Sequence, residues 1–226
     1  MSSRPERVVR YIVAEGVIGV GKTTLVNALA ARLHARTVFE VFEENPFLRG
    51  FYADRARYAF STEMFFLLSR FNQQETFAQE DLLQQHAVSD YLFQKCRLFA
   101  GLTLSDAELE LFARVYGILE RQVPVPDCVI HLTAPIEVLL ERIASRGRDY
   151  EQSITGDYLR ELDERYRTLF AGYSAAPVVT IDTTEVDFRD PEQVDRLLRL
   201  LVSGRRGAFD SRSLAALPLV DPPPRS

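Results

Sequence analysis

Gly16-Val-Ile-Gly-Val-Gly21-Lys22-Thr23 decides the fold of this chain. The stretch fits G-x-x-x-x-G-K-[ST] at every fixed position, with a β-branched run before it and a helical pattern after it. Its glycines let backbone N–H groups close around a β-phosphate, and the following helix adds positive potential. Lys22 is expected on the β- and γ-phosphates, and the Thr23 hydroxyl on Mg²⁺. The residues expected at the nucleotide are Gly16, Gly19, Gly21, Lys22, Thr23 and Thr24.

Strand and helix patterns alternate along the chain. Short, β-branched apolar runs predict five strands, at 8–14, 37–42, 87–90, 128–133 and 178–182. Helical spacing predicts helices between them, the longest over 60–79. This alternation is typical of a parallel sheet covered by helices on both faces. We therefore predict an α/β fold of the P-loop NTPase kind, with a five-stranded parallel sheet flanked by helices.

Length and composition restrict the class of protein further. A chain of 226 residues suits one domain, placed at 1–203. The Gly-, Arg-, Ser- and Pro-rich segment 204–226 is expected to be a disordered tail. A formal net charge of -5 makes a nucleic-acid polymer a poor partner. There is no signal-peptide pattern and no apolar run long enough to span a bilayer, so a cytoplasmic location is expected.

Charged residues near the predicted phosphate loop suggest phosphoryl chemistry. Asp90 closes a predicted strand and is a second candidate Mg²⁺ ligand, although an N-cap role fits it too. Arg142, Arg146 and Arg148 stand at the end of one predicted helix and just beyond it. Guanidinium groups bind phosphate oxygens, so these residues predict a short arginine-rich lid over the γ-phosphate. A solvated helix end is the alternative.

Four blocks together resemble the deoxynucleoside kinase family, in its bacterial deoxyguanosine/deoxyadenosine kinase branch, from about Tyr11 to Val202. They are the phosphate loop, Glu40-Val-Phe-Glu-Glu-Asn-Pro-Phe-Leu48, Phe60-Ser-Thr-Glu-Met-Phe-Phe-Leu-Leu-Ser-Arg70 and Arg142-Ile-Ala-Ser-Arg-Gly-Arg-Asp-Tyr-Glu151. The resemblance implies a five-stranded sheet with an arginine lid, Mg·ATP as donor, a deoxynucleoside as acceptor, and a homodimer.

The resemblance also implies roles for single residues. Glu40 takes the position of the general base that accepts the proton of the 5′-hydroxyl. Tyr52 and Glu151 take the positions that hold the sugar 3′-hydroxyl. For Tyr52 the competing interpretation is core packing, and for Glu151 it is a solvated helix start. Asp90 is counted with the acceptor-binding residues as well as with the metal ligands.

At the base site this sequence departs from the family pattern. Glu63 stands where the family has Gln, Arg70 where it has Arg, and Cys96 where it has Asp. Tyr91 replaces the Arg that usually follows the acidic strand end. An ionised carboxylate only accepts hydrogen bonds, which suits guanine N1–H and the 2-amino group. With Arg70 or Lys95 as the donor to guanine O6 or N7, deoxyguanosine is predicted as the preferred substrate. An ion pair between Glu63 and Arg70 is the alternative.

Two further functions compete with a deoxynucleoside kinase. A thymidylate-type nucleotide kinase shares the phosphate loop and lid, but Glu40 would repel the phosphate of its acceptor. A non-catalytic ATP-binding regulator would not need the full set of charged residues. The prediction is therefore transfer of the ATP γ-phosphate to a purine deoxynucleoside in nucleotide salvage, with a deoxyadenosine-preferring or broad-specificity enzyme as the variant.

Overall fold

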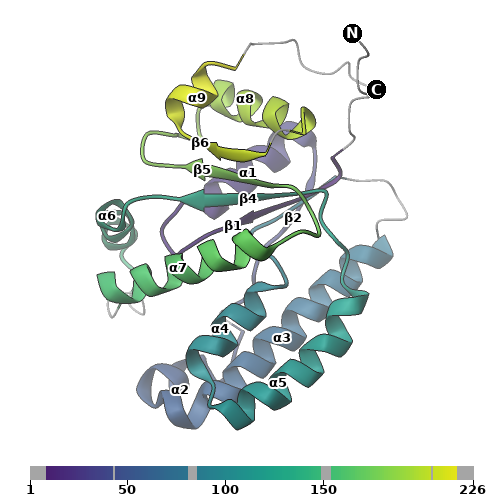
Figure 1. Ribbon diagram of the computed structural model, residues 1–226, viewed down its shortest axis with the longest axis vertical. Helices are drawn as coiled ribbons and strands as arrows, with labels where there is room; N and C mark the ends of the chain where they lie inside the picture. The colour runs from purple at the N-terminus through teal and green to yellow at the C-terminus, as the bar shows by residue number, and fades with distance from the viewer. Residues whose placement is uncertain (1–8, 43, 81–85, 149–153, 205, 218–226) are drawn as a thin grey trace. The chain divides into compact units, whose positions relative to one another are not determined.

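The computed structural model of the protein describes residues 9–42, 44–80, 86–148, 154–204 and 206–217 (Figure 1). The chain forms two compact units. The first comprises Met1–Thr37, His86–Asp90 and Pro126–Ser226, and the second Val38–Gln85 and Tyr91–Val125. The single domain expected over 1–203 stays a prediction. Among the described residues, no helix is long and apolar enough to cross a membrane.

The described part of the chain contains a six-stranded sheet, one strand more than predicted. Its order is β2 (Arg36–Val38), β3 (Ala87–Ser89), β1 (Tyr11–Glu15), β4 (Cys128–Thr133), β5 (Val178–Asp182) and β6 (Gly207–Phe209). The pairings of β1 with β3 and β4, and of β5 with β4 and β6, are parallel. All five residues of β1 are buried, which explains its continuous apolar pattern.

Helices cover both faces of this sheet in the first unit. They are α1 (Lys22–Leu33), α6 (Ile136–Arg146), α7 (Gly156–Gly172), α8 (Pro191–Val202) and α9 (Ser211–Ala215). Figure 1 shows α8 and α9 above the sheet and α7 below it. The α8 helix begins at Pro191, because the Asp190 side chain accepts from the Glu192 N–H and Pro191 occupies the first turn.

The predicted disorder of 204–226 is wrong for the part of this segment that the structure describes. Gly207–Phe209 pairs with β5, and the short helix α9 packs against α8 with Leu214 only 2% exposed. The Asp210 side chain accepts from the Ser213 N–H and forms a capping box that starts α9. The prediction relied on the average composition of 204–226, which does not reveal a short strand or a single helix cap inside the segment. Residues 218–226 lie outside the described residues.

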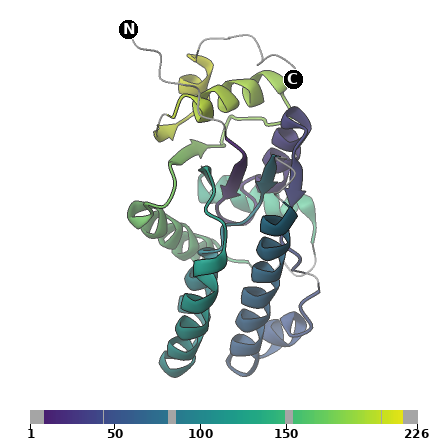
Figure 2. The same ribbon diagram turned by 90° about the vertical axis from the view of Figure 1, so that its right-hand side faces the viewer.

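The second unit is helical. It contains α2 (Leu48–Ala53), α3 (Arg55–Glu80), α4 (Lys95–Thr103), α5 (Asp106–Leu119) and the 3₁₀ turn η2 (Glu120–Gln122). Figure 2 shows α3 and α5 side by side. Ser105 and Glu108 form a capping box at the start of α5. The core between the helices is built from Leu67, Phe93, Cys96, Ala100, Phe112 and Tyr116.

Candidate functional site

The phosphate loop connects β1 to α1 in the first unit, and its backbone requires glycine. Gly16 has φ +146°, and a Cβ there would lie 2.4 Å from the Leu132 carbonyl oxygen. Gly19 has φ +85°, and its Cβ would lie 2.9 Å from a side-chain carbon of Ile143. Both positions therefore exclude a side chain by conformation and by space. Gly21 is the N-cap of α1 and brings no side chain to the first-turn amides.

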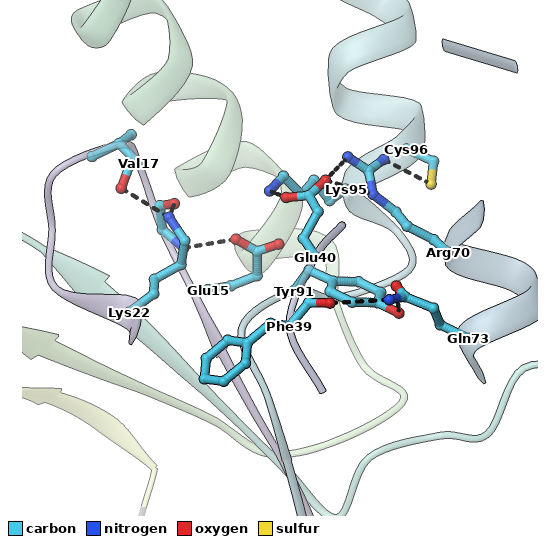
Figure 3. Close-up of polar contacts among 11 residues, drawn as sticks. Glu15, Val17, Lys22, Phe39, Glu40, Arg70, Gln73, Tyr91, Lys95 and Cys96 are labelled. Atoms are coloured by element: carbon cyan, nitrogen blue, oxygen red, sulfur yellow. Dashed lines mark hydrogen bonds and ion pairs between the residues drawn. The ribbon is translucent and has the colours of Figure 1, made fainter. Parts of the chain in front are cut away.

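Lys22 is folded back over this loop. Its Nζ donates to the carbonyl oxygens of Gly16 at 2.7 Å and Val17 at 3.1 Å (Figure 3). The Gly16 N–H in turn donates to the buried Glu15 carboxylate at 2.8 Å. The ammonium is thus held at the mouth of the loop, next to a helix N-terminus that favours anions. This arrangement fits a β- or γ-phosphate contact for Lys22.

The two candidate Mg²⁺ ligands lie at one edge of the sheet. Thr23 is exposed on the first turn of α1, and Thr24 next to it is exposed too. Asp90 directly follows β3, whose Ser89 is in register with Val13 of β1. Carboxyl ends of parallel strands share an edge. One hydroxyl and one carboxylate suit Mg²⁺, which keeps several waters and substrate oxygens in its shell.

The three arginines of the predicted lid fall into two groups. Arg142 is fixed, because its guanidinium donates to the Thr183 hydroxyl at 2.9 Å and the Thr183 carbonyl at 2.7 Å, just after β5. Arg146 ends α6 and Arg148 follows the left-handed C-cap Gly147, and both side chains are exposed. Glu151, the predicted sugar contact beyond them, lies outside the described residues.

The second unit gathers the predicted acceptor-side residues around Glu40. Arg70 of α3 donates to Glu40 Oε1 through Nε at 2.9 Å and also through Nη2, and Lys95 of α4 donates to Oε2 at 2.7 Å (Figure 3). Burial disfavours the charged carboxylate, but these two cations outweigh it and hold the pKa of Glu40 well below its usual range. Glu40 is therefore a permanently ionised hydrogen-bond acceptor near neutral pH.

Side chains outside the predicted set hold the backbone at Glu40. The strand expected over 37–42 ends at Val38, because the Phe39 carbonyl accepts from Gln73 Nε2 of α3 at 3.0 Å. The Tyr91 hydroxyl donates to Gln73 Oε1 at 2.9 Å. Sequence reasoning noted Tyr91 as a departure from the family pattern without seeing this contact. The sequence signal that could have pointed to this contact was the presence of Tyr91 where the resemblance implies an arginine.

Glu63 lies deeper in the same cluster and is only 4% exposed. The Thr103 hydroxyl donates to its Oε1 at 3.1 Å. Burial raises the pKa of Glu63 to about 7, while the attraction of Arg70 and the hydrogen bond from Thr103 offset only part of that effect. The alternative interpretation of Glu63, an ion pair with Arg70, does not match these contacts, because Arg70 donates to Glu40 and Glu63 accepts from Thr103.

Cys96 lies where Arg70 can reach it. Arg70 Nη1 donates to Cys96 Sγ at 3.1 Å, and burial raises the pKa of this thiol. Sulfur is a weak acceptor, so this guanidinium arm has a poorer partner than the two arms on Glu40. The structure therefore brings Glu40, Glu63, Arg70, Lys95 and Cys96 together, although they come from three separate segments.

Two other residues on the acceptor side differ from the expectation. Tyr52 on α2 is 46% exposed, and its ring makes an edge contact with Phe51 at 5.8 Å between ring centroids, so the core-packing alternative does not apply. Asn45, to which the sequence analysis assigned no role, is buried. Its Nδ2 donates to the Thr62 carbonyl at 3.2 Å and its Oδ1 accepts from the Phe47 N–H at 3.0 Å.

Comparisons with known proteins identify related chains. A family model described as deoxynucleoside kinase matches residues 12–200. A deoxyguanosine kinase of Bacillus subtilis is 35% identical over 182 residues, which covers 80% of this chain and 88% of that protein. A deoxyadenosine/deoxycytidine kinase of the same organism is 31% identical, covering 80% and 86%. The solved structure of M. mycoides deoxyadenosine kinase with bound dATP has a TM-score of 0.72 at 20% identity, covering 84% and 98%.

Proposed function

Since this chain belongs to the deoxynucleoside kinase family and is an ATP-dependent deoxynucleoside kinase, we propose that its preferred acceptor is deoxyguanosine. The observation that carries the proposal is Glu63, a buried carboxyl at the position where the family reads the base. Above its pKa of about 7, Glu63 offers acceptors only. Guanine presents two adjacent donors, N1–H and the 2-amino group, which pair with such a carboxylate.

Arg70 supports the same choice of base. Its Nη1 arm rests on the Cys96 thiol, a weak acceptor. A guanine O6 or N7 is a better acceptor and would replace the sulfur, while the other two arms stay on Glu40. Lys95, the other predicted donor to guanine, we assign instead to holding Glu40, because its ammonium already bonds Oε2.

We assign the phosphoryl transfer to the following groups. Glu40 accepts the hydrogen bond and then the proton of the 5′-hydroxyl, a role that needs orientation more than base strength because the transition state is loose. Lys22, Arg146 and Arg148 neutralise charge on the transferred phosphoryl group. Mg²⁺, when held by Thr23 and Asp90, supplies charge neutralisation between the β- and γ-phosphates.

The remaining assignments rest on the resemblance. The nucleotide set contains Gly16, Gly19, Gly21, Thr24 and Arg142, and the sugar set contains Tyr52 and Glu151. Tyr52 lies on α2 and is 46% exposed. We further propose a cytoplasmic homodimer that acts in nucleotide salvage.

The test is phosphate transfer from Mg·ATP to each of the four deoxynucleosides, with deoxyguanosine monophosphate and thymidine monophosphate as additional acceptors. Strong preference for deoxyguanosine supports the proposal. Preference for another deoxynucleoside keeps the kinase and removes our assignment of the base site. Activity on the monophosphates alone would overturn the choice of acceptor class, since Glu40 is expected to repel a phosphate at the 5′ position.

A further inference from the structure

The second unit holds two buried carboxyl groups that differ in how their charge is compensated. Glu40 receives both nearby cations, Arg70 on one oxygen and Lys95 on the other. Glu63 receives a neutral donor, the Thr103 hydroxyl. A buried carboxylate without a cation of its own is costly, so the proton is retained more readily at Glu63 than at Glu40.

The groups that face Glu63 from its neighbouring elements agree with this. Arg70 on its own helix and Lys95 from α4 favour the ionised form. Glu40 from the segment after β2 disfavours it, and burial disfavours it most. Cys96 from α4 stays a neutral thiol, because burial raises its pKa. The pKa of Glu63 is about 7, so both protonation states are populated near neutral pH.

The two states present different hydrogen-bonding patterns to a base. An ionised Glu63 offers two acceptors, which match guanine N1–H and its 2-amino group. A protonated Glu63 offers one donor and one acceptor, as a glutamine amide does, and these match adenine N1 and the 6-amino group. Thr103 can serve both states, since its hydroxyl lies 3.0 Å from the Phe99 carbonyl as an alternative acceptor.

We propose that the protonation state of Glu63 sets the base preference of this enzyme: the ionised form selects deoxyguanosine, and the protonated form admits deoxyadenosine. The inference rests on the proposed function, that the chain phosphorylates purine deoxynucleosides. One site thus takes either purine, and the proton concentration decides between them.

The test is an internal competition. Deoxyguanosine and deoxyadenosine at equal concentration share one reaction with Mg·ATP. Chromatography gives the ratio of the two monophosphates from about pH 5.5 to pH 8.5, a range that spans the Glu63 pKa of about 7. Effects of pH on the donor site, on Glu40 and on the lid cancel in the ratio, and neither base changes charge in this range. The ratio of deoxyguanosine to deoxyadenosine product should rise with pH by at least about tenfold, because mismatched polar pairing costs far more than that.

Three variants make the test specific. Glu63→Gln should give a ratio that favours deoxyadenosine and no longer depends on pH. Thr103→Val removes a hydrogen bond that lowers the pKa of Glu63, so it should move the midpoint of the ratio curve to higher pH. Thr103→Ser keeps a hydroxyl and should keep the wild-type midpoint.

Each outcome decides something. A wild-type ratio that stays constant over the whole pH range overturns the inference, even if deoxyguanosine is preferred throughout. A pH-dependent ratio that persists in Glu63→Gln assigns the titration to another group and overturns it too. If Glu63→Gln does not fold, the midpoints of Thr103→Val and Thr103→Ser decide, and equal midpoints count against the proposal. Transfer to neither purine would instead contradict the proposed function.

Discussion

The two lysines of this chain, Lys22 and Lys95, lie one in each compact unit and act on different kinds of partner. Lys22 donates to main-chain carbonyls of its own loop, six and five residues before it in the sequence. Lys95 donates to a side-chain carboxylate 55 residues before it, which it shares with Arg70. Apart from the histidines, all other basic residues of the chain are arginines.

The difference separates the donor residues from the acceptor residues of the proposed reaction. The phosphate side uses backbone amides and conformational freedom, so its chemistry follows from the spacing of a few residues. The acceptor side uses buried side chains from separate helices, so its chemistry follows from which charges meet in the folded unit. Loss of a side chain on the phosphate side should lower the rate of phosphoryl transfer to every acceptor. Loss of a side chain on the acceptor side should change the pH dependence of the reaction and the preference among acceptors.

The largest effect is expected for Lys22→Met. This change removes the only side-chain cation in the phosphate loop, so kcat/KM should fall on the order of 10³-fold with all acceptors alike. A steady-state assay at saturating deoxynucleoside measures it. Arg114→Met, which removes an exposed cation paired with Glu110, is the charge-matched control and should keep wild-type rates. A loss that differs strongly between acceptors would contradict the separation of the two sides.

Lys95→Met should alter the pH profile more than the maximal rate. Lys95 helps to hold the pKa of Glu40 low against the effect of burial, so its removal raises that pKa. Glu40 is then protonated at a higher pH than in the wild type, so the acid limb of the kcat/KM profile should move to higher pH by about one to three units. Lys95→Arg keeps a cation beside Glu40, so its kcat/KM profile at acid pH should be close to that of the wild type. Parallel wild-type and Lys95→Met profiles would show that Lys95 does not act through Glu40.

Glycines of the phosphate loop should differ in what they tolerate. A Cβ at Gly16 would lie 2.4 Å from a backbone oxygen, whereas one at Gly21 meets nothing within 4 Å. Both positions have positive φ, so Gly21→Ala carries conformational strain alone, about 1 kcal/mol. Gly16→Ala adds a clash with main chain and should lose roughly 2 to 4 kcal/mol of unfolding free energy. Denaturant titration measures both, and equal losses would be inconsistent with the close approach to Leu132.

The smallest effect concerns the stability conferred by Glu63. Its pKa in the folded protein is about 7, above the ordinary glutamate value, so between those two values the folded state binds more protons than the unfolded state. Wild-type stability should therefore decrease as the pH rises through this window. Glu63→Gln removes the titration, and its unfolding free energy relative to wild type should improve by about 1 to 3 kcal/mol from pH 5 to pH 8. A pH-independent difference would mean that Glu63 titrates normally.

The same contrast explains which parts of the structure could be predicted from sequence. Strands 128–133 and 178–182 have the bounds that their patterns predict, because a short apolar, β-branched run is a local signal. The phosphate loop is likewise a local motif. The strand expected over 37–42 stops early because Gln73, 34 residues away, takes the Phe39 carbonyl. Strand β6 was missed because three residues carry too little periodicity to be read.

For the proposed acceptor side, the sequence predicted a set of residues but not the contacts that they make with one another. Arg70 or Lys95 was predicted as the donor to the base, and the sequence did not indicate that both bond Glu40, from 30 and 55 residues away. Cys96 stands where the resemblance implies an aspartate, and in the folded unit its thiol receives one arm of Arg70 while Glu40 receives the others. Such an arrangement depends on distances in the folded unit, which no spacing in the sequence records.

The most direct measurement of the central claim is the competition between deoxyguanosine and deoxyadenosine at about pH 8, where Glu63 is ionised, run side by side for wild type and Glu63→Gln. The account predicts that the wild type favours deoxyguanosine and that the variant loses deoxyguanosine use and gains deoxyadenosine use, with similar ATP affinity in both. The same product ratio in the two proteins would contradict it, because the base would then be read by some other group.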